Sequence, residues 1–439
     1  MPRSTSRNSS RVPPRPAAAH PVERRALLAR VPWLAVAITV LVIITAAFAV
    51  DPVRDAATLQ SVGEARLSQP AAYIAIAPLS NVLDTITLLS IPQHIAIVLW
   101  AIVLFGAWRV RRSRHGTNTL GELRAAAVSL LALVFVYALA ALLPRPMASL
   151  TLSDDTVLAV DFHSHTKYSH DGRMGWTEDD VRDWHRAAGF DVAYVTDHAT
   201  VEGAERGIAS NPRLAGEGTM LMQGLEAFYQ GEHVNILSAG RRFKGLTTAD
   251  LRNVDEQSLA LASFLPATSP VLLETIPGKL DRIPRTAQGV PGVQAIEIVD
   301  GSPRGLTQGR RDRARIVHIA DSLNLALVTG SDNHGWGRTA PGWTLVRIPG
   351  WRGMTTDSLS LRIEDILRVG RREATRVVER RVAPGTEAIA LAFAAPVVAW
   401  EMLAMLSADE RVVWILWTWA IVIAIRGWRA MREHRAAPA

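Results

Sequence analysis

The chain has long apolar runs near both ends and a more polar block between them. The first run, ALLARVPWLAVAITVLVIITAAFAV from Ala26 to Val50, is long enough to cross about 30 Å of hydrocarbon at roughly 1.5 Å per residue. Similar runs extend from Ile91 to Trp108 and from Leu123 to Leu143. We therefore expect a membrane region over residues 26–145 with about three transmembrane helices.

Two stretches of this region allow a second interpretation. The first run could be a signal peptide, but the tail before it is long and no small-residue cleavage pattern stands out, so an uncleaved anchor is favoured. The stretch from Ala71 to Ser90 is apolar but carries Asn81 and Asp84. It is either an interfacial helix or a fourth span.

The C-terminal part repeats the apolar pattern. Two runs, Ala388 to Leu406 and Val412 to Ile425, are separated by SADER, which predicts a closing transmembrane hairpin over residues 387–426. Residues 1–25 are rich in Ser, Pro and Arg and are predicted to be a disordered basic tail. Residues 427–439 form a second basic tail.

The middle block, residues 156–381, alternates short β-branched runs with longer amphipathic stretches. The predicted strands are LAVDF, DVAYVTD, TMLMQGLEAF, VNILSAG, PVLLETI, VQAIEIVD and LALVTGSD. Between the first two, WTEDDVRDWHRAAG has helical spacing, with Thr177 as N-cap and Gly189 at the helix end. About seven such units favour an α/β fold with a parallel, barrel-like sheet and chemistry at the strand ends.

Composition narrows the class of protein and of site. The mean hydropathy of +0.13, with 20% charged residues, is too apolar for a purely soluble chain. No cysteine is present, so disulfides and thiolate metal sites are excluded. The net charge of +7 comes largely from arginines in the termini and beside apolar runs, which favours membrane flanks over nucleic acid as partner.

The strongest local signal is the segment DFHSHTKYSHDG. His163 and His165 alternate along a predicted strand, so both imidazoles project from one face. Asp171 follows in a turn marked by Gly172 and can fold back over the strand end. On its own, a His-x-His pair on a strand binds metal in about half of cases.

Three further strand ends carry the same kinds of side chain. A single acidic-histidine pair at a strand end is more often an N-cap or a loop salt bridge. The pairs here are Asp197 with His198, Glu226 with His233, and Asp332 with His334. Such side chains are unlikely to occur at all four strand ends by chance. The C-terminal ends of the strands are also the edge where β/α folds have their active sites.

The donor set indicates divalent ions. Nitrogen and oxygen donors without sulfur suit Zn, Mn or Fe, with Mg as an alternative, and several carboxylates indicate two or three ions. A polynuclear site produces hydroxide near neutral pH and holds both the attacking and the leaving oxygen, which is the usual way to cleave phosphate esters.

From about Val160 to Gly342, the chain resembles the PHP (polymerase and histidinol phosphatase) superfamily. The resemblance implies a distorted (β/α)7 barrel with up to three metal ions, here inserted between N-terminal and C-terminal transmembrane helices. It assigns His163, His165, Glu226 and Asp332 to a first metal, and Glu226 with His233 to a second.

The resemblance assigns Asp171, His198 and His334 to a third metal. We expect Asp197 to orient His198 or a bound water. His170, within the first motif, is expected to touch substrate, although a solvated turn histidine is about as common. Asp197 and His170 are thus the two residues that we assign to catalysis.

One position departs from the family pattern. The family usually has a histidine before a proline in a middle strand, whereas this chain has Ile276 before Pro277. Glu274 lies two residues earlier on the same strand face and could substitute, but a loop salt bridge is as common a role. The second metal is therefore expected to be weak, exchangeable or absent.

Other charged residues give weaker signals. Lys167, Arg304 and Arg338 lie near predicted strand ends and could neutralise a phosphate, but single basic loop residues are usually solvated. His185 and His318 fall within helical patterns, where surface or packing roles are more common.

We expect a membrane-anchored, metal-dependent phosphoric ester hydrolase in which metal-activated hydroxide attacks a phosphomonoester or phosphodiester. The expected partners are a small phosphorylated substrate and the lipid bilayer. An exonuclease acting on oligonucleotides is an alternative, but it needs a basic, aromatic groove, and the candidates Arg310, Arg311 and Arg313 are scattered. A non-catalytic metal- or ligand-sensing membrane module is a third interpretation, motivated by Ile276.

The charge pattern gives conflicting signals about topology in a multi-pass protein of the cytoplasmic membrane. The N-terminal tail and the RVRRSR loop favour the cytoplasm, which leaves the catalytic domain extracytoplasmic. The segments RVGRREATRVVERR and RGWRAMREHR favour the opposite arrangement. Because the first helices usually dominate, we expect an extracytoplasmic domain, unless Ala71 to Ser90 spans.

Overall fold

The structure, a computed structural model, describes residues 32–113, 119–237, 251, 270–285, 292–383 and 388–436. The predicted disordered tail, residues 1–25, lies outside these ranges. Part of the predicted C-terminal tail is helical, because the last helix continues to Ala436.

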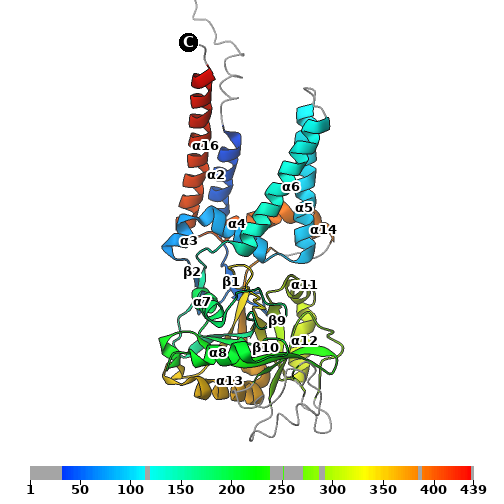
Figure 1. Cartoon of the computed structure of the whole chain (residues 1–439), viewed down its shortest axis with the longest axis vertical. Helices are drawn as coiled ribbons and strands as arrows, with labels where there is room; N and C mark the ends of the chain where they lie inside the picture. Colours follow the sequence, from blue (N-terminus) through cyan, green and yellow to red (C-terminus); the bar gives the residue numbers. More distant parts are fainter. Residues whose placement is uncertain are drawn as a thin grey trace, which may run out of the picture.

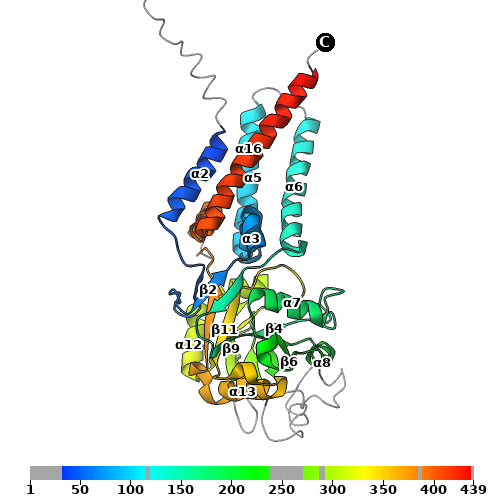
Figure 2. The same ribbon diagram turned by 90° about the vertical axis from the view of Figure 1, so that its left-hand side faces the viewer.

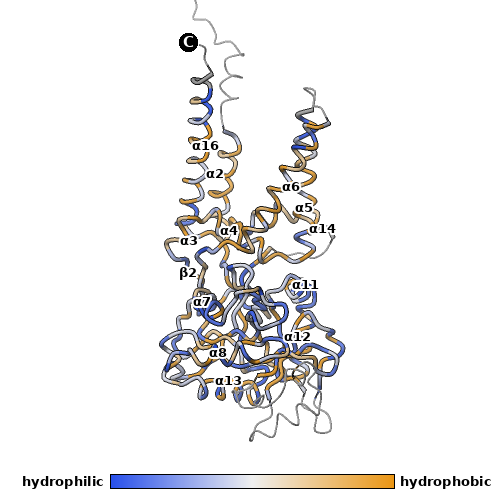
Figure 3. The backbone as a smooth tube through the Cα atoms, in the orientation of Figure 1, coloured by the Kyte–Doolittle hydropathy of each residue, from blue (hydrophilic) through white to orange (hydrophobic). Residues whose placement is uncertain are grey.

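Long helices project from one end of an α/β part (Figure 1, Figure 2). They are α2 (Trp33–Ala46), α5 (Ile91–Ser113), α6 (Thr119–Leu142) and α16 (Ala408–Ala436). Four short helices lie between the long helices and the α/β part: α3 (Ala71–Ala75), α4 (Ala77–Thr87), α14 (Ala388–Ala392) and α15 (Ala394–Ala404). Figure 3 shows hydrophobic residues along much of the projecting helices, with hydrophilic segments at the ends of α16 and at the far end of α5 and α6.

Among the described residues, two helices are long and apolar enough to cross a membrane by length and composition. They cover Ile91–Arg111 and Thr119–Leu142. Their apolar side chains are largely exposed, as at Ile102 (58%) and Leu131 (67%). Exposed apolar surface of this extent needs an apolar environment or a partner.

Prolines break two of the predicted apolar stretches, and those predictions need correction. The stretch 71–90 is two short helices with Pro78 at the start of the second, so it does not form a fourth span. The first arm of the predicted C-terminal hairpin is divided at Phe393 into α14 and α15, with Pro396 in the first turn of α15. Proline lacks an N–H and its ring clashes with the preceding turn. Helix α3 therefore ends before Pro78, and α14 ends before Pro396.

The seven strands predicted from the sequence are all present. They are β4 (Val157–Ser164), β5 (Val192–Val195), β6 (Met220–Tyr229), β7 (Glu232–Leu237), β8 (Val271–Glu274), β9 (Ala295–Asp300) and β10 (Ala326–Gly330). They are consecutive in a ten-stranded sheet of order β1-β12-β11-β4-β5-β6-β7-β8-β9-β10.

The prediction of a parallel sheet is wrong at β7, which runs antiparallel to both β6 and β8. Gln230 and Gly231 connect β6 to β7 with φ values of 51° and 86°. Two consecutive positive φ values are typical of a two-residue hairpin turn, which can join only antiparallel strands. The fold is therefore mixed α/β.

The sheet curls so that β10, the last strand of the β4-to-β10 series, comes back beside β4, the first. Just beyond the strands, the Asp332 N–H donates to the His163 carbonyl (2.9 Å), and the His165 N–H donates to the Asn333 carbonyl (3.1 Å). Strands not predicted from the sequence extend the sheet beyond β4: β11 (Gly342–Arg347), β12 (Thr375–Arg380) and β1 (Val53–Asp55), all antiparallel. A separate pair joins β2 (Ala65–Ser68) to β3 (Ser149–Leu152).

Helices cover the sheet and one end of the curl. They are α7 (Glu178–Ala188), α8 (Glu202–Ala209), α11 (Pro303–Arg311), α12 (Arg313–Leu323) and α13 (Thr356–Gly370), with short 3-10 turns at Ala215–Glu217, Trp351–Gly353 and Arg371–Glu373. Thr177 caps α7 and Gly189 ends it with φ 86°, as the sequence predicts. Leu359 and Ile363 of α13 pack with Leu158 near the start of β4. Helix α13 thus lies at the end of the molecule opposite the long helices (Figure 1).

Candidate metal centre

Two histidines at the end of β4 begin the site. His163 is the penultimate residue of β4 and His165 follows the strand. The β4–β5 register shifts between Asp161 and Ser164, and such an irregularity re-aims side chains. The two rings lie 5.0 Å apart between centroids, and both are buried.

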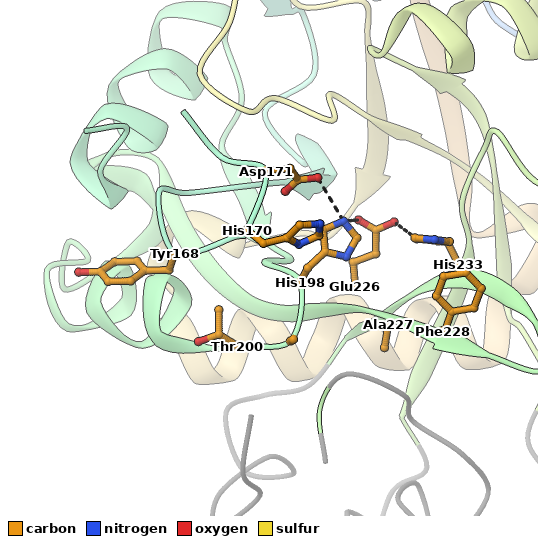
Figure 4. Close-up of a pocket in the computed structure, with 10 residues that line it drawn as sticks. Tyr168, His170, Asp171, His198, Thr200, Glu226, Ala227, Phe228 and His233 are labelled. Atoms are coloured by element: carbon orange, nitrogen blue, oxygen red, sulfur yellow. Dashed lines mark hydrogen bonds and ion pairs between the residues drawn. The ribbon is translucent and has the colours of Figure 1, made fainter. Parts of the chain in front are cut away.

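Glu226 on β6 is the centre of the histidine cluster. Its Oε2 lies 2.9 Å from His163 Nε2, 3.3 Å from His165 Nε2 and 3.2 Å from His198 Nε2. Its Oε1 lies 2.9 Å from Nδ1 of His233. Figure 4 shows His198 and His233 on opposite sides of this carboxylate. The β6–β7 hairpin explains the His233 contact, because it brings the start of β7 beside the end of β6.

The loop after β10 supplies a second carboxylate and a further histidine. Asp332 Oδ1 lies 3.4 Å from His163 Nε2 and 3.3 Å from His165 Nε2. His334 Nε2 lies 3.1 Å from Asp171 Oδ2, and its ring stacks on His165 at 4.1 Å. Asp332 has φ 45°, a left-handed conformation that is rare outside glycine and concentrates at functional sites.

The structure thus brings together all eight residues that were predicted to bind metal. They form overlapping groups whose potential ligand atoms lie within 4.8 Å of one another: His163, His165 and Asp332; His165, Asp171 and His334; His165, His198 and Glu226; His170, Asp171 and His198. His233 joins this set through its contact with Glu226.

Two acidic residues behind His163 were not singled out from the sequence. Glu297 Oε1 lies 2.9 Å from His163 Nδ1, and Asp300 Oδ2 lies 3.7 Å from the same nitrogen. Both carboxylates are buried. The sequence contains a pattern that could have identified them, because VQAIEIVD is an apolar strand interrupted by acidic residues. A Cβ at Gly330 would come within 2.4 Å of Glu297 Oε1 and 2.6 Å of His163 Cβ, so the close packing here requires glycine.

The contact between Asp161 and His185 was also not predicted from the sequence. His185 Nε2 and Asp161 Oδ2 lie 2.7 Å apart, and His185 Nδ1 lies 2.7 Å from the Val181 carbonyl. Asp161 also accepts the Ser331 N–H at 2.8 Å. This pair joins α7, β4 and the end of β10, so His185 has the packing role that is common for histidines in helices.

The two residues assigned to catalysis have different surroundings. Asp197 is buried, and its two carboxylate oxygens accept the N–H and the hydroxyl of Thr166, each at 2.6 Å. Its hydrogen bonds therefore hold the loop after β4, and its orientation of His198 remains a prediction. His170 is exposed in that loop, with its ring 4.9 Å from the His198 ring.

The charges of the centre are strongly coupled. Burial favours the neutral form of Glu226, but the charge and hydrogen bond of His163 outweigh it and hold the pKa of Glu226 well below its usual range. Burial likewise opposes a charge on His163, yet Glu226, Glu297 and Asp332 raise its pKa. Burial lowers the pKa of His198 to about 4, so that ring is neutral and suited to ligate a cation.

The donors fit divalent cations. Neither ring nitrogen of the buried His165 makes a hydrogen bond to a described residue, although Nε2 lies 3.3 Å from both Glu226 and Asp332. Short distances without hydrogen-bond geometry are expected where donors surround a shared ion. Asp300 Oδ2 is also buried without a hydrogen-bond partner among the described residues. A cation would relieve the repulsion among these carboxylates.

The residue that replaces the family histidine packs away from the site. Ile276 is buried in an apolar cluster, and its N–H donates to Glu297 Oε2 at 2.9 Å. Both carboxylate oxygens of Glu274 are buried without a hydrogen-bond partner among the described residues. Burial, with Glu232 and Glu297 nearby, raises the pKa of Glu274 to about 9. In the absence of a cation, this raised pKa keeps Glu274 in the neutral form near pH 7.

A cavity of about 790 Å³ opens onto the histidines and carboxylates. Its walls include Tyr168, His170, Thr200 and Phe228 beside Asp171, His198, Glu226 and His233 (Figure 4). Lys167 and Arg206 lie over the ring of the lining residue Tyr168 at 5.1 and 5.3 Å, and Arg206 is also paired with Glu202 at 2.9 Å.

The arginines considered for an oligonucleotide groove are engaged elsewhere. Arg310 donates to the Leu88 carbonyl and to Gln93, and Arg313 pairs with Glu379. Arg311 pairs with Asp312. Arg338 donates to the Arg145 carbonyl at 3.3 Å, toward the helices. Of the basic residues considered for phosphate binding, Lys167 lies near the cavity, because it contacts the ring of Tyr168, which lines the cavity.

No known family model matches the chain, and no curated protein sequence matches it. Solved structures with similar folds include PsfC from Pseudomonas syringae PB-5123, with TM-score 0.36 and 16% identity over 57% of this chain and 99% of PsfC. A two-domain protein containing a predicted PHP-like metal-dependent phosphoesterase from Bacteroides vulgatus ATCC 8482 gives TM-score 0.32 and 17% identity, over 52% of this chain and 67% of that one.

The lesion-specific endonuclease PfuEndoQ from Pyrococcus furiosus gives TM-score 0.32 and 13% identity, over 43% of this chain and 52% of the endonuclease. The structural neighbours thus include PHP-like metal-dependent phosphoesterases and endonuclease Q. At TM-scores below 0.5, function has to be inferred from the site itself.

Proposed function

We propose that the chain is a membrane-anchored, metal-dependent phosphoesterase that hydrolyses phosphomonoesters or phosphodiesters. The observation that carries the proposal is the convergence on Glu226 of His163 and His165 from the end of β4, His198 from the segment after β5, and His233 from β7. The same cluster contains the buried carboxylates of Glu297 and Asp300, and burying several acids together is costly unless cations compensate them.

The residues that would hold the ions are those that the family resemblance assigns. His163, His165, Glu226 and Asp332 would hold one ion, and Asp171, His198 and His334 would hold another. Support comes from the short distances within these sets, such as 3.1 Å from His334 Nε2 and 3.6 Å from His198 Nε2 to Asp171 Oδ2. Glu226 and His233 would contribute to a further, weaker position, since Ile276 offers no donor. When bound, such ions act as Lewis acids toward phosphoryl oxygens and lower the pKa of water.

The chain's own residues would position these ligands and the substrate. Glu297 would accept a hydrogen bond from His163 Nδ1–H, which leaves Nε2 to ligate. Asp197 fixes the loop after β4 through Thr166. His170 and Tyr168 at the cavity wall would contact the substituent on the phosphate, and Lys167 would attract the anion.

Anchoring of the enzyme in a membrane is part of the proposal. Support comes from the length, apolarity and exposure of α5 and α6. These helices project on one side of the α/β part, together with α2 and α16 (Figure 1). The catalytic part would then lie at the membrane surface.

The test uses the full chain, purified in detergent and reconstituted in lipid nanodiscs. Metal content is measured together with hydrolysis of an aryl phosphate monoester and of its diester. We expect bound divalent metal and hydrolysis of at least one ester. His163→Ala should lower kcat/KM by more than about 100-fold, because the loss of a residue that binds the metal directly costs more than the roughly 10- to 100-fold typical of residues that only orient such ligands.

His318→Ala is the matched control, because His318 is exposed on α12 away from the site. A His163→Ala enzyme as fast as the parent would exclude the mechanism. Bound metal without hydrolysis of either ester would favour the non-catalytic, metal-sensing alternative.

A further inference from the structure

The metal centre faces the projecting helices. The loop that carries Asp332 and His334 continues into Gly337, whose N–H donates to the Ala141 carbonyl of α6 at 2.8 Å. Two residues on, the Thr339 hydroxyl donates to Asp84 of α4 at 2.9 Å. Helix α13 covers the opposite end of the curled sheet (Figure 1). The catalytic edge is therefore the edge nearest the helices.

A second cavity, of about 260 Å³, lies between the metal centre and the helices. Asp171, Asp332 and His334 line one side of it, and Thr87 and Leu88 at the end of α4 line the other. Asp171 also lines the larger cavity described above. Both cavities thus border the metal centre, and Asp171 lines both of them.

The second cavity lies at the level where the apolar helices begin. Leu88 precedes the start of α5 at Ile91 by three residues. Gly337, another lining residue, is bonded to Ala141 in the last turn of α6. The lining of the cavity is thus linked by chain or by hydrogen bond to the near ends of both helices that are long enough to span a bilayer.

Apolar side chains are exposed beside this cavity. Met174 is 95% exposed and Trp336, a lining residue, is 53% exposed. The Arg173 guanidinium lies 5.1 Å from the Trp176 ring centroid and 5.7 Å from that of Trp336. An exposed tryptophan beside an arginine is typical of the boundary between bilayer and water.

We propose that the substrate is a membrane-borne phosphoester, whose phosphate reaches the metal centre from the bilayer surface through the cavity between α4 and the strand ends. The inference rests on the proposed phosphoesterase function. The lipid-bearing substituent would occupy the smaller cavity, and a polar substituent would extend into the larger one. Confinement of enzyme and ester to one membrane raises the effective concentration of the ester at the site.

The first arm of the test maps which face of the α/β part meets lipid. The chain has no cysteine, so a single Met174→Cys or Asp357→Cys substitution gives one labelling site. Asp357 is exposed on α13, at the far end. With an environment-sensitive fluorophore in nanodiscs, lipids that carry a nitroxide near the headgroup should quench the label at 174 and leave the label at 357 unquenched. Equal or absent quenching at 174 would overturn the proposal.

The second arm compares esters that share the same reacting group. Full-length enzyme is assayed with phosphatidic acid in its own nanodisc against glycerol 3-phosphate, and with phosphatidylglycerol against glycerophosphoglycerol. We expect kcat/KM for a lipid-borne ester to exceed that of its soluble partner by about tenfold or more, through confinement in the bilayer.

The two arms separate this inference from the proposed function. Hydrolysis of the soluble esters at equal or greater kcat/KM would overturn the membrane-borne substrate and leave the phosphoesterase standing. Failure to hydrolyse any ester, with the aryl phosphates also intact, would overturn both.

Discussion

At the scale of single residues, the site depends on side chains that keep one another in defined protonation states. His163 has a carboxylate at each ring nitrogen, Glu226 at Nε2 and Glu297 at Nδ1. A metal-binding histidine usually donates its second ring N–H to such an outer carboxylate, which fixes the tautomer and the ring orientation. The outer carboxylate is therefore expected to matter without touching the substrate.

Glu297→Gln is expected to weaken metal binding by about 10- to 100-fold. The amide keeps the size of the side chain but removes the negative charge that stabilises the Nδ1 proton of His163. Metal affinity is measured by competition with a fluorescent chelator. Glu373→Gln, at an exposed position, is the control, and unchanged affinity in Glu297→Gln would exclude the positioning role.

Glu274 gives a pH-dependent prediction. Its pKa is raised by burial from 4.5 to about 9, so between these values the unfolded chain releases a proton that the folded chain keeps. Stability should therefore fall as pH rises from about 4.5 to 9, by at most roughly 1.4 kcal/mol per pH unit. Glu274→Gln cannot ionise and should lose less stability over this range.

Urea unfolding of the two proteins at pH 6 and pH 8.5, with chelator present, measures this difference. Parallel losses of stability would show that Glu274 is not a buried neutral acid. A lower metal content in Glu274→Gln would instead make Glu274 the substitute ligand considered for the position of Ile276.

At the scale of elements, a buried ionic cluster joins α4 to the loop that follows the metal centre. Asp84 lies 2.5 Å from Arg145 and 2.7 Å from Arg380, and it also accepts hydrogen bonds from Tyr73 and Thr339. All of Asp84's partners come from different elements, so the cluster fixes the short helices against the α/β part. Thr339 is seven residues from Asp332, which places the cluster close to the site along the chain.

Asp84→Asn is expected to destabilise the protein by about 3–5 kcal/mol, because it leaves two buried arginines without a counter-charge. The free energy of unfolding in detergent measures the effect. Asp321→Asn is the control: it breaks the more exposed pair with Arg372, which typically contributes less than about 1 kcal/mol. Similar losses in the two variants would contradict the structural role of the cluster.

At the scale of the whole molecule, the arrangement of helices bears on topology. Arg109 and Arg111 lie at the end of α5 that is remote from the α/β part, and Arg426, Arg429 and Arg432 lie at the corresponding end of α16 (Figure 1). Because α14 and α15 do not form one spanning helix, RGWRAMREHR falls on the same side as the RVRRSR loop. Of the two segments that opposed an extracytoplasmic domain, RVGRREATRVVERR alone still does.

We therefore expect the α/β part to lie outside the cytoplasm, since basic flanks remain on the cytoplasmic side. Single cysteines at Asp357 and Arg432 test this with a membrane-impermeant maleimide. Asp357→Cys should react in intact cells, whereas Arg432→Cys should react only after permeabilisation. The reverse pattern would place the domain in the cytoplasm.

The sequence by itself determined the seven strands, the cap of α7 and the set of nitrogen and oxygen donors. These follow from local periodicity, turn chemistry and residue type, which a short window of sequence contains. The direction of β7 was also encoded locally, in Gln230 and Gly231, but a two-residue connection outside the common Asn-Gly pattern is a weak signal.

Only the tertiary structure decided which donors share an atom and what lies behind and beside them. Glu297 and Asp300 lie on β9, far from His163 in the sequence, and the curl of the sheet brings them against His163. The orientation of the metal centre toward the helices depends on Gly337, Thr339 and Asp84, which are far apart in sequence. Such contacts form when the sheet closes and the helices pack on its edge. The free energy of that packing depends on several segments together, so no single segment of the sequence determines it.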